Sequence, residues 1–395
     1  MSSRGNSGIV VGASRVERNS ALLGKAAVSI LAESGWTSLS TRTLCARCGL
    51  TSGALYTRFE SLEQLLELLW VTQLEAALLE PLDMAAKALA AADEATFVAA
   101  LTALARPNPT VLAAVELVQA AMVEPDLASF FLPRIRTLLV DRTTPSEALS
   151  SVDAAVSATI LFIGFGFVLK SRRPWASAID LLPELRRYFA ALSRPADAEP
   201  TPRDEIAEYL YSYPFDTGDE RLDRVLQATA MTIGEVGYRR ATVQRIARAA
   251  SVSTGFIMSR FPTKLDLFIT ITEEMWGRGF AQISSYLAET GERMGPAIAE
   301  AIAWREMQNP VISKVALLTL ETNRLAGFLP SLGDVVFSQE EQFFKSTPTG
   351  SPSAFGLSEM ALGMGLILVA WFSPAVRDLP YVSVTAPLVA TAPNL

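Results

Sequence analysis

The feature that most constrains this chain is a sequence pattern that occurs twice. Residues 39–59 fall on residues 241–261 without a gap when the sequence is shifted by 202 positions. The match keeps the kind of residue at these positions: Gly35/Gly237, Trp36/Tyr238, Ser40/Thr242, Leu44/Ile246, Leu50/Val252, Gly53/Gly255, Leu55/Ile257, Arg58/Arg260, Phe59/Phe261 and Leu65/Leu267. A register held over so many positions indicates an internal duplication, so we expect two related halves.

The repeated pattern predicts two short helices joined by a tight turn. In the first copy Ser40 is a candidate N-cap, because its hydroxyl can accept a backbone N–H at a helix start. Gly49 stands where the chain must leave that helix in the left-handed conformation. Thr51 or Ser52 would cap the second helix, which would bury Leu55. This arrangement is a helix-turn-helix, whose second helix can enter the DNA major groove.

Charge is spread unevenly along the chain. The net charge is −7 overall, but residues 15–60 carry +3 and residues 219–264 carry +4, which leaves −14 on the remainder. Two basic islands on an acidic body fit two local surfaces that contact phosphates. Ordinary helical surfaces also show such variation in charge, so this pattern alone leaves both interpretations open.

Helical periodicity and proline spacing divide the chain into six segments. We expect a flexible arm over residues 1–18, a first helix-turn-helix domain over 19–68 and a first helical body over 69–193. A Pro-rich linker is expected at 194–218, followed by a second helix-turn-helix domain at 219–270 and a second body at 271–395. The tail after Pro374 shows no clear equivalent of the amphipathic helix expected at 179–192.

Residues 152–169 form a strongly apolar stretch that residues 360–372 echo. Polar residues interrupt the first stretch, so a buried interface helix is favoured over a membrane span. Gly164 and Gly166 would let another helix approach closely. The fold class expected is therefore all-α without a membrane span, with a four-helix interface that joins residues 152–192 to residues 353–390.

The order of elements and the stretch Thr51-Ser-Gly-Ala-Leu-Tyr-Thr-Arg-Phe59 resemble the TetR/AcrR family of transcriptional regulators. The resemblance covers the helix-turn-helix region of each half, while the bodies match only in helical character and order. It implies an Ω-shaped, dimer-type fold, a ligand cavity in each body, and release from operator DNA when a ligand binds.

The resemblance also implies which residues of the first half contact DNA. Thr41 and Arg42 open a helix with which the family touches phosphates and a base edge. Gly53 would let the backbone approach DNA, and Tyr56 matches a phosphate-contacting tyrosine. The implied set is Thr41, Arg42, Thr51, Ser52, Gly53, Ala54, Tyr56, Thr57 and Arg58. The family's lysine at the start of the fourth helix is replaced here by Leu62.

The second half keeps that lysine as Lys264 but changes other contacts. The replacements are Met258 for Tyr56, Gln244 for Arg42, Phe256 for Ala54 and Ser251 for Gly49. Gln244 could pair bidentately with adenine. Ser251 costs about 1 kcal/mol if the turn needs a left-handed residue. The implied set is Gln244, Arg245, Ser253, Thr254, Gly255, Phe256, Ser259, Arg260 and Lys264, and its losses put strong DNA binding by this half in question.

The rest of the composition argues against an enzyme. The chain has no histidine and two cysteines, which excludes His-based triads and ordinary His metal sites. Cys45 and Cys48 form a Cys-x-x-Cys, but Ala247 and Ala250 match them in the second copy, so buried filler is favoured over a redox or metal role. We expect no cofactor, no metal and a reducing, cytoplasmic setting.

Within the bodies, several residues allow two interpretations. Trp175, Trp304, Phe97, Phe162 and Phe280 could line a ligand cavity, although core packing is the more common role. Glu116 and Glu306 lie in apolar helices and could bind a ligand amine, although a surface or capping role is favoured.

The sequence thus predicts a DNA-binding transcriptional regulator, a ligand-responsive repressor whose two halves form an intramolecular pseudo-dimer on an asymmetric operator. The partners expected are double-stranded DNA and a small apolar effector, with a further homodimer left open. One alternative is a degenerate binding protein with weak or no DNA affinity that sequesters a partner or small molecule. Another is an enzyme that acts through Cys45 and Cys48.

Overall fold

The structure is a computed structural model that describes residues 15–197, 200–205, 207, 215–309, 313–345 and 352–392. These residues form helices and turns, with no β-strand among them, so the all-α prediction is confirmed. The first head comprises α1 (Arg15–Ser34), α2 (Thr41–Cys48), α3 (Ser52–Tyr56) and α4 (Leu62–Leu69). The second head comprises α11 (Glu220–Arg240), α12 (Val243–Ala249), α13 (Thr254–Met258) and the start of α14 (Lys264–Met294).

The remaining helices form the two bodies. The first body contains α5 (Glu75–Ala90), α6 (Glu94–Ala105), α7 (Pro109–Val123), α8 (Pro125–Thr143), α9 (Ser151–Lys170) and α10 (Leu182–Leu192). The second contains the rest of α14, α15 (Pro296–Glu306), α16 (Ser313–Ala326), α17 (Pro330–Lys345), α18 (Ala354–Phe372) and α19 (Val382–Ala390). Prolines begin several of these helices, where their missing N–H costs no helical hydrogen bond.

Three elements differ from the sequence prediction. Helix α1 begins at Arg15, so residues 15–18 belong to a helix, while residues 1–14 of the expected arm lie outside the described residues. The sequence showed no clear equivalent of α10 after Pro374, but the structure has one, because α19 forms there and packs on α10 and α15. The long helix of the first half is interrupted by a π-helical segment at Trp70–Leu74, whereas α14 runs without a break.

Helices α9 and α18 cross at the centre of the molecule and make its most extensive helix–helix contact. A Cβ atom added to Gly166 would lie 1.7 Å from the carbonyl oxygen of Ala361. A Cβ added to Gly365 would lie 1.8 Å from the carbonyl oxygen of Phe162. Only glycine lets the two backbones meet this closely, which confirms the predicted role of Gly166. Helices α10 and α19 pack beside this crossing, so residues from both halves form the predicted four-helix contact.

Helices α9 and α18 are also long and apolar enough, by length and composition, to cross a membrane. In the structure 83% of the most apolar window of α9 and 56% of that of α18 are buried inside the protein. The apolar surface of α9 is therefore largely accounted for by contact with α18, α6 and α8.

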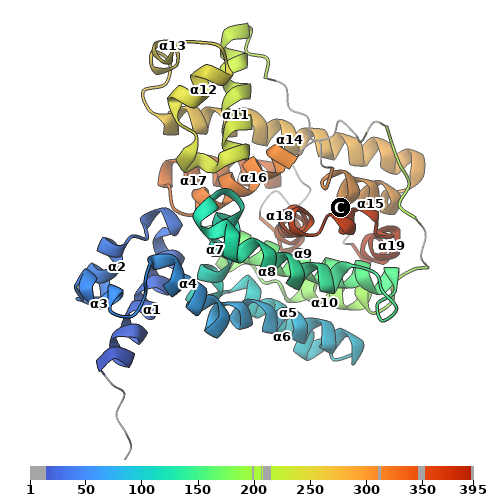
Figure 1. Ribbon diagram of the computed structural model, residues 1–395. Coiled ribbons are helices and arrows are strands. Elements are labelled where there is room, and N and C mark those ends of the chain that lie inside the picture. The colour runs from blue at the N-terminus through green and yellow to red at the C-terminus, as the bar shows by residue number, and fades with distance from the viewer. Residues whose placement is uncertain are drawn as a thin grey trace, which may run out of the picture.

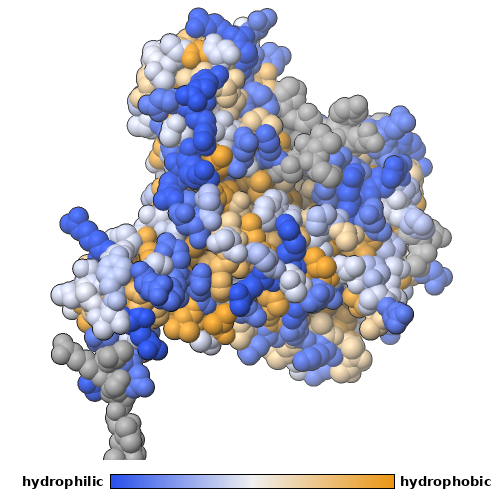
Figure 2. Space-filling view, viewed as in Figure 1, coloured by the Kyte–Doolittle hydropathy of each residue, from blue (hydrophilic) through white to orange (hydrophobic). Residues whose placement is uncertain are grey.

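Both heads lie on the same side of the α9–α18 crossing, at the left of Figure 1, with the first head below α7 and the second above it. In Figure 2 hydrophilic residues cover most of the upper head, while apolar residues are visible on the body between the heads.

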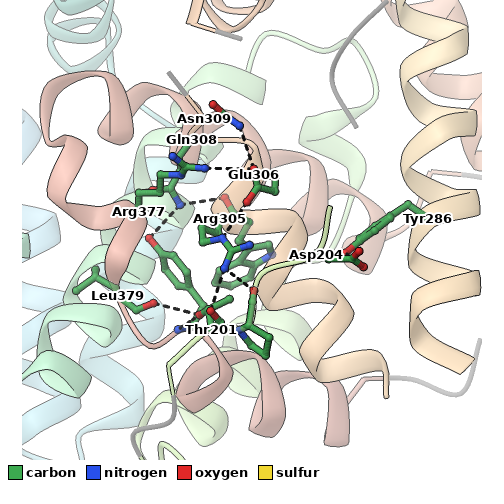
Figure 3. Close-up of polar contacts among 12 residues, drawn as sticks. Thr201, Asp204, Tyr286, Arg305, Glu306, Gln308, Asn309, Arg377 and Leu379 are labelled. Carbon is green, nitrogen blue, oxygen red and sulfur yellow. Dashed lines mark hydrogen bonds and ion pairs between the residues drawn. The ribbon is translucent and has the colours of Figure 1, made fainter. Parts of the chain in front are cut away.

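The described part of the predicted linker is held against the second body. The backbone N–H of Tyr381 donates to the Thr201 hydroxyl at 3.0 Å, and the Arg305 guanidinium donates to the Thr201 carbonyl at 2.9 Å (Figure 3). Nearby, buried Glu306 pairs with Arg305 at 2.9 Å and with Arg377 at 3.3 Å. Glu306 therefore has neither of the roles weighed from the sequence, since it belongs to a buried ion-pair network beside the linker.

Candidate DNA interface and its junction with the body

The first helix-turn-helix forms as its sequence predicts. Ser40 caps α2 by accepting the Thr43 N–H at 3.1 Å, while the Thr43 hydroxyl accepts the Ser40 N–H at 2.9 Å. Gly49 ends α2 with φ 66° and ψ 26°, in the left-handed region. Thr51 occupies the N-cap position of α3 without a side-chain capping bond, so the predicted cap is only positional. Leu55 is fully buried beneath the turn.

The structure brings several predicted contact residues of the first head together on its surface. Tyr56 is 56% exposed, and its hydroxyl lies 3.3 Å from that of Thr41. This hydrogen bond joins the end of α3 to the start of α2. Arg42 and Arg58 are exposed, and neither is paired with an acidic side chain of the described residues. An added Cβ on Gly53 would meet nothing closer than the Thr51 hydroxyl at 3.7 Å, so this surface is open.

The other predicted residues of this head lie around the same helix. Thr51, Ser52 and Thr57 are exposed, and Ala54 is half-buried. The Thr57 hydroxyl donates to the Gly53 carbonyl at 2.6 Å, so it is engaged within α3. Cys45 is buried, and burial raises the pKa of its thiol, which disfavours the reactive thiolate.

In the second head, several of the predicted contact residues are engaged with one another. The guanidinium groups of Arg221 and Arg260 lie 4.2 Å and 3.9 Å from the centroid of the Phe256 ring. Arg260 also pairs with Asp219 at 3.3 Å. Phe256 is therefore half-buried, and two guanidinium groups lie over its ring. The exposed residues of the set are Gln244, Arg245, Ser253, Thr254, Gly255, Ser259 and Arg260.

Lys264 lies at the start of α14 and points back into its own head. Its ammonium donates to the Tyr238 carbonyl at 2.7 Å and lies 4.1 Å from the centroid of the Tyr238 ring. Partial burial lowers the pKa of Lys264, an effect that Glu321 opposes. The lysine kept by the second half thus holds the turn after Gly237 together.

Each head joins the bodies through its glycine–aromatic turn. Gly35 and Gly237 have φ values of 75° and 73°, where a residue with a side chain would be strained. The backbone N–H of Trp36 donates to Glu116 of α7 at 2.7 Å. The backbone N–H of Tyr238 donates to Glu321 of α16 at 2.9 Å. Each half therefore uses one buried glutamate of its body to hold the turn of its own head.

Arg324 connects these two junctions across the halves. It is buried, and its guanidinium pairs with Glu116 at 2.7 Å and with Glu321 at 2.9 Å. Burial alone would lower the pKa of Arg324, but the two carboxylates raise it, so it stays charged. Glu116 therefore binds an amide and a guanidinium inside the protein, and the ligand-amine and surface roles weighed from the sequence are both wrong.

Each turn also touches the opposite half. An added Cβ on Gly35 would lie 2.9 Å from the ring of Phe328, which follows α16. An added Cβ on Gly237 would lie 2.9 Å from the side chain of Val123, at the end of α7. Arg239 pairs with Glu124 through its Nε at 2.9 Å. Each head is thus positioned by both bodies at once.

The roles of Glu321 and Arg324 were not predicted from the sequence. A signal was present, because Glu116 and Glu321 each lie in the helix that precedes a proline-started helix, and each is followed three positions later by Gln119 or Arg324. That spacing places the second residue on the same helix face as the glutamate. The two halves match closely in residue type only through the heads, so the equivalence of these body positions does not stand out.

A cavity of about 480 Å³ lies in the second body, where Trp304 and Phe280 line it. In the first body Phe97 and Phe162 are fully buried, and Trp175 packs edge-on against Phe344 at 5.3 Å. A second pocket beside Arg172 and Arg324 holds only about 20 Å³. The structure thus shows a ligand-sized cavity in the second body, whereas the pocket beside Arg172 and Arg324 is too small for a ligand.

Comparison with known family models identifies the two helix-turn-helix regions. Residues 23–69 and 225–271 each match the family of bacterial regulatory proteins, tetR family. Among solved structures, the chain is similar to one titled as a structural analysis of the fatty acid degradation regulator FadR from Bacillus halodurans. That likeness has 20% identity and a TM-score of 0.27, and it covers 44% of this chain and 99% of the other. A search of curated proteins found no match. The chain therefore carries the helix-turn-helix module of bacterial regulatory proteins of the tetR family twice, once in each half.

Proposed function

We propose that this regulator binds one asymmetric operator as a single chain, with its two halves acting as an intramolecular pseudo-dimer. The observation that carries the proposal is the α9–α18 crossing, where Gly166 and Gly365 bring two backbones into contact and hold both heads on one side. Family members that work as dimers present two heads to two half-sites, and operator symmetry follows protein symmetry. Heads of different sequence should therefore read different half-sites.

The first head should supply most of the DNA affinity. Its Arg42, Arg58 and Tyr56 are exposed around one helix-turn-helix. In the second head Phe256 and Arg260 are engaged with each other, and Lys264 donates to backbone carbonyls. Fewer groups are then available there for phosphates, which lowers both affinity and its dependence on salt.

A route from ligand to DNA runs through α16. Val315, Ala316 and Thr319 of this helix line the cavity, and Glu321 lies half a turn further along, at the Tyr238 turn. A ligand that shifts α16 would move Glu321 and Arg324 together, and thereby the turns of both heads. Ligand binding would then change the distance between heads and release DNA, as expected of a cytoplasmic repressor.

The experiment is selection of random double-stranded DNA by the purified full chain, followed by footprinting and light scattering of the complex. We expect a non-palindromic site protected over two half-sites by one chain. A palindrome bound by two chains would overturn the pseudo-dimer. Failure to enrich any sequence would overturn specific DNA binding.

The second candidate is a protein that has lost DNA affinity and sequesters a partner or small molecule. The internal engagement of Phe256, Arg260 and Lys264 favours it. The double variant Arg42→Ala with Tyr56→Ala separates the two candidates, because regulation by a sequestering protein would survive it. Loss of regulation together with loss of DNA binding would support the DNA-binding function.

A further inference from the structure

The cavity of the second body is lined mainly by apolar and aromatic side chains. Helices α14, α15, α16 and α18 contribute most of its wall, and Phe343 and Phe344 of α17 close one side. Its volume of about 480 Å³ falls in the range of sites for small organic molecules. The aromatic members of the lining are Trp276, Phe280, Trp304, Phe343, Phe344 and Phe355.

Two carboxylates interrupt this apolar wall. Glu300 of α15 and Glu359 of α18 both line the cavity. Glu300 accepts a hydrogen bond from the Trp304 indole at 2.7 Å, and Glu359 accepts one from Arg187 at 3.1 Å. The side chain of Glu359 is about one-third exposed and lines the cavity.

Positive charge is scarce around this pair. Arg187 pairs with Glu359 at 3.1 Å and with Glu184 at 2.7 Å. One guanidinium thus already balances two carboxylates, and Glu300 is a third. Tyr188 donates a hydrogen bond to Glu359 at 3.4 Å and brings no positive charge. Burial and the nearby Glu359 raise the pKa of Glu300 to about 7. Among the described residues Glu300 forms no ion pair, and Arg187, which acts on it electrostatically, is already paired with Glu184 and Glu359.

Among the described residues of the cavity wall, the one lysine already has acidic and amide partners. Lys170 donates to Glu340 at 2.7 Å and to Asn323 at 3.0 Å, and its side chain is only 3% exposed. Arg173 pairs with the same Glu340 at 2.8 Å. Lys170 thus offers little of its charge to a ligand, whereas Glu300 and Glu359 border the empty volume.

We propose that this cavity binds an apolar molecule carrying one positively charged nitrogen, which lies against Glu300 and Glu359. The proposal rests on the proposed ligand response and names the chemical class of its effector. The carboxylates supply the missing countercharge, and aromatic lining residues such as Trp304 and Trp276 suit a cation held in a desolvated site. A carboxylate ligand would instead meet two carboxylates of the protein.

The test is isothermal calorimetry on the full chain without DNA, with three probes of equal chain length: decyltrimethylammonium, decanol and decanoate. The ammonium should bind at least about tenfold more tightly than decanoate, a ratio worth about 1.4 kcal/mol. The double variant Glu300→Gln with Glu359→Gln should remove most of that preference and leave decanol binding unchanged. Glu292→Gln, an exposed change on α14, is the matched control.

Two features keep this test decisive. Because Glu300 must lose its proton to act as counterion, affinity for the ammonium should rise as pH passes upward through about 7. Tighter binding of decanoate, an unchanged preference in the double variant, or no binding of any probe would each overturn the proposal. If the double variant fails to fold, Glu300→Gln alone makes the same test. Because ligand binding is measured without DNA, a negative result would overturn this effector class but would not bear on operator binding, which the DNA selection tests.

Discussion

Gly164 and Gly363 lie two residues before the glycines of the central crossing, on α9 and α18, and their surroundings differ. An added Cβ on Gly164 would lie 2.3 Å from Leu82 and 2.9 Å from Leu104, so the first body is packed against it. An added Cβ on Gly363 would meet only Met307 atoms at 3.8 Å or more, at the wall of the cavity. The interior of one body is filled where the other is hollow.

In contrast to the interiors, the α9–α18 crossing has the same close backbone approach on both helices, because each helix depends on the glycine of the other. Gly166 and Gly365 each accommodate the backbone of the other helix, so a side chain on either one displaces both. The packing of Leu82 in the first body does not depend in this way on the residues around the cavity of the second body. Duplicated interfaces therefore keep their small residues, whereas duplicated interiors are free to diverge, here into one scaffold body and one candidate ligand body.

Of the substitutions that test the difference between the two halves, Arg324→Ala should change the free energy of unfolding most. Arg324 and Gln119 follow their glutamates by three residues in the two halves, but only Arg324 is charged. Its removal takes from buried Glu116 and Glu321 the guanidinium with which both pair, so we expect the free energy of unfolding to fall by about 3–5 kcal/mol. Urea denaturation measures it.

Gln119→Ala is the matched control. Gln119 donates a single hydrogen bond to the Leu320 carbonyl at 3.2 Å, so its loss should cost about 1 kcal/mol. Hydrogen exchange at the Trp36 and Tyr238 amides should speed up in both turns after Arg324→Ala. Equal losses for the two variants would show that the halves are joined symmetrically.

Gly166→Ala comes next in size. The added methyl would overlap the Ala361 carbonyl, which is backbone and cannot rotate away, so we expect a loss of about 3 kcal/mol. Gly365→Ala should cost a similar amount, because it meets the Phe162 carbonyl. Gly277→Ala in α14 has open space and should instead stabilise by about 1 kcal/mol. A mild effect at Gly166 would mean that the two halves can separate.

The two heads can be compared by their DNA affinity. Arg42→Ala should weaken operator binding by about tenfold or more, since an arginine contact to a base edge contributes about 1–3 kcal/mol. Gln244→Ala at the equivalent place should weaken it by less than about threefold, if the second head contributes little. Fluorescence anisotropy at fixed salt gives both values. The reverse order would make the second head the main reader.

The heads could be predicted from sequence because their signals are local. The Ser40 cap, the Gly49 turn and the buried Leu55 each depend on neighbours within a few residues. The junction could not be predicted in this way, since Glu116 meets Trp36 across 80 residues and Arg324 across 208. Such contacts depend on how whole helices pack against each other, and a local sequence pattern does not determine that packing.

The same distinction explains the bodies. Apolar periodicity predicted helices at 152–169 and 360–372 and their mutual contact, because a helix apolar on all sides must be buried. The hollow in one body could not be predicted, since Trp304 and Phe280 line a cavity while Phe97 and Phe162, equally apolar, fill a core. Residue type fixes whether a side chain is buried but leaves open how completely its neighbours fill the space.

The smallest predicted effect concerns the turn inside each helix-turn-helix. Ser251 has φ 55°, close to the 66° of Gly49, so the turn does need a left-handed residue in both heads. The hydrogen bonds also agree, since Leu50 donates to Cys45 at 2.9 Å and Val252 donates to Ala247 at 3.0 Å. The second head therefore carries a backbone strain that the first head lacks.

Exchange of these residues isolates that strain. Ser251→Gly should stabilise the chain by about 1 kcal/mol, and Gly49→Ser should destabilise it by about the same amount. Packing does not confound the exchange, because an added Cβ at Gly49 would meet no atom within 4 Å and Ser251 is exposed. Thermal unfolding of the two single variants and the double exchange gives the values. If the two changes do not cancel in the double exchange, the strain at Ser251 is offset by contacts that Gly49 never had.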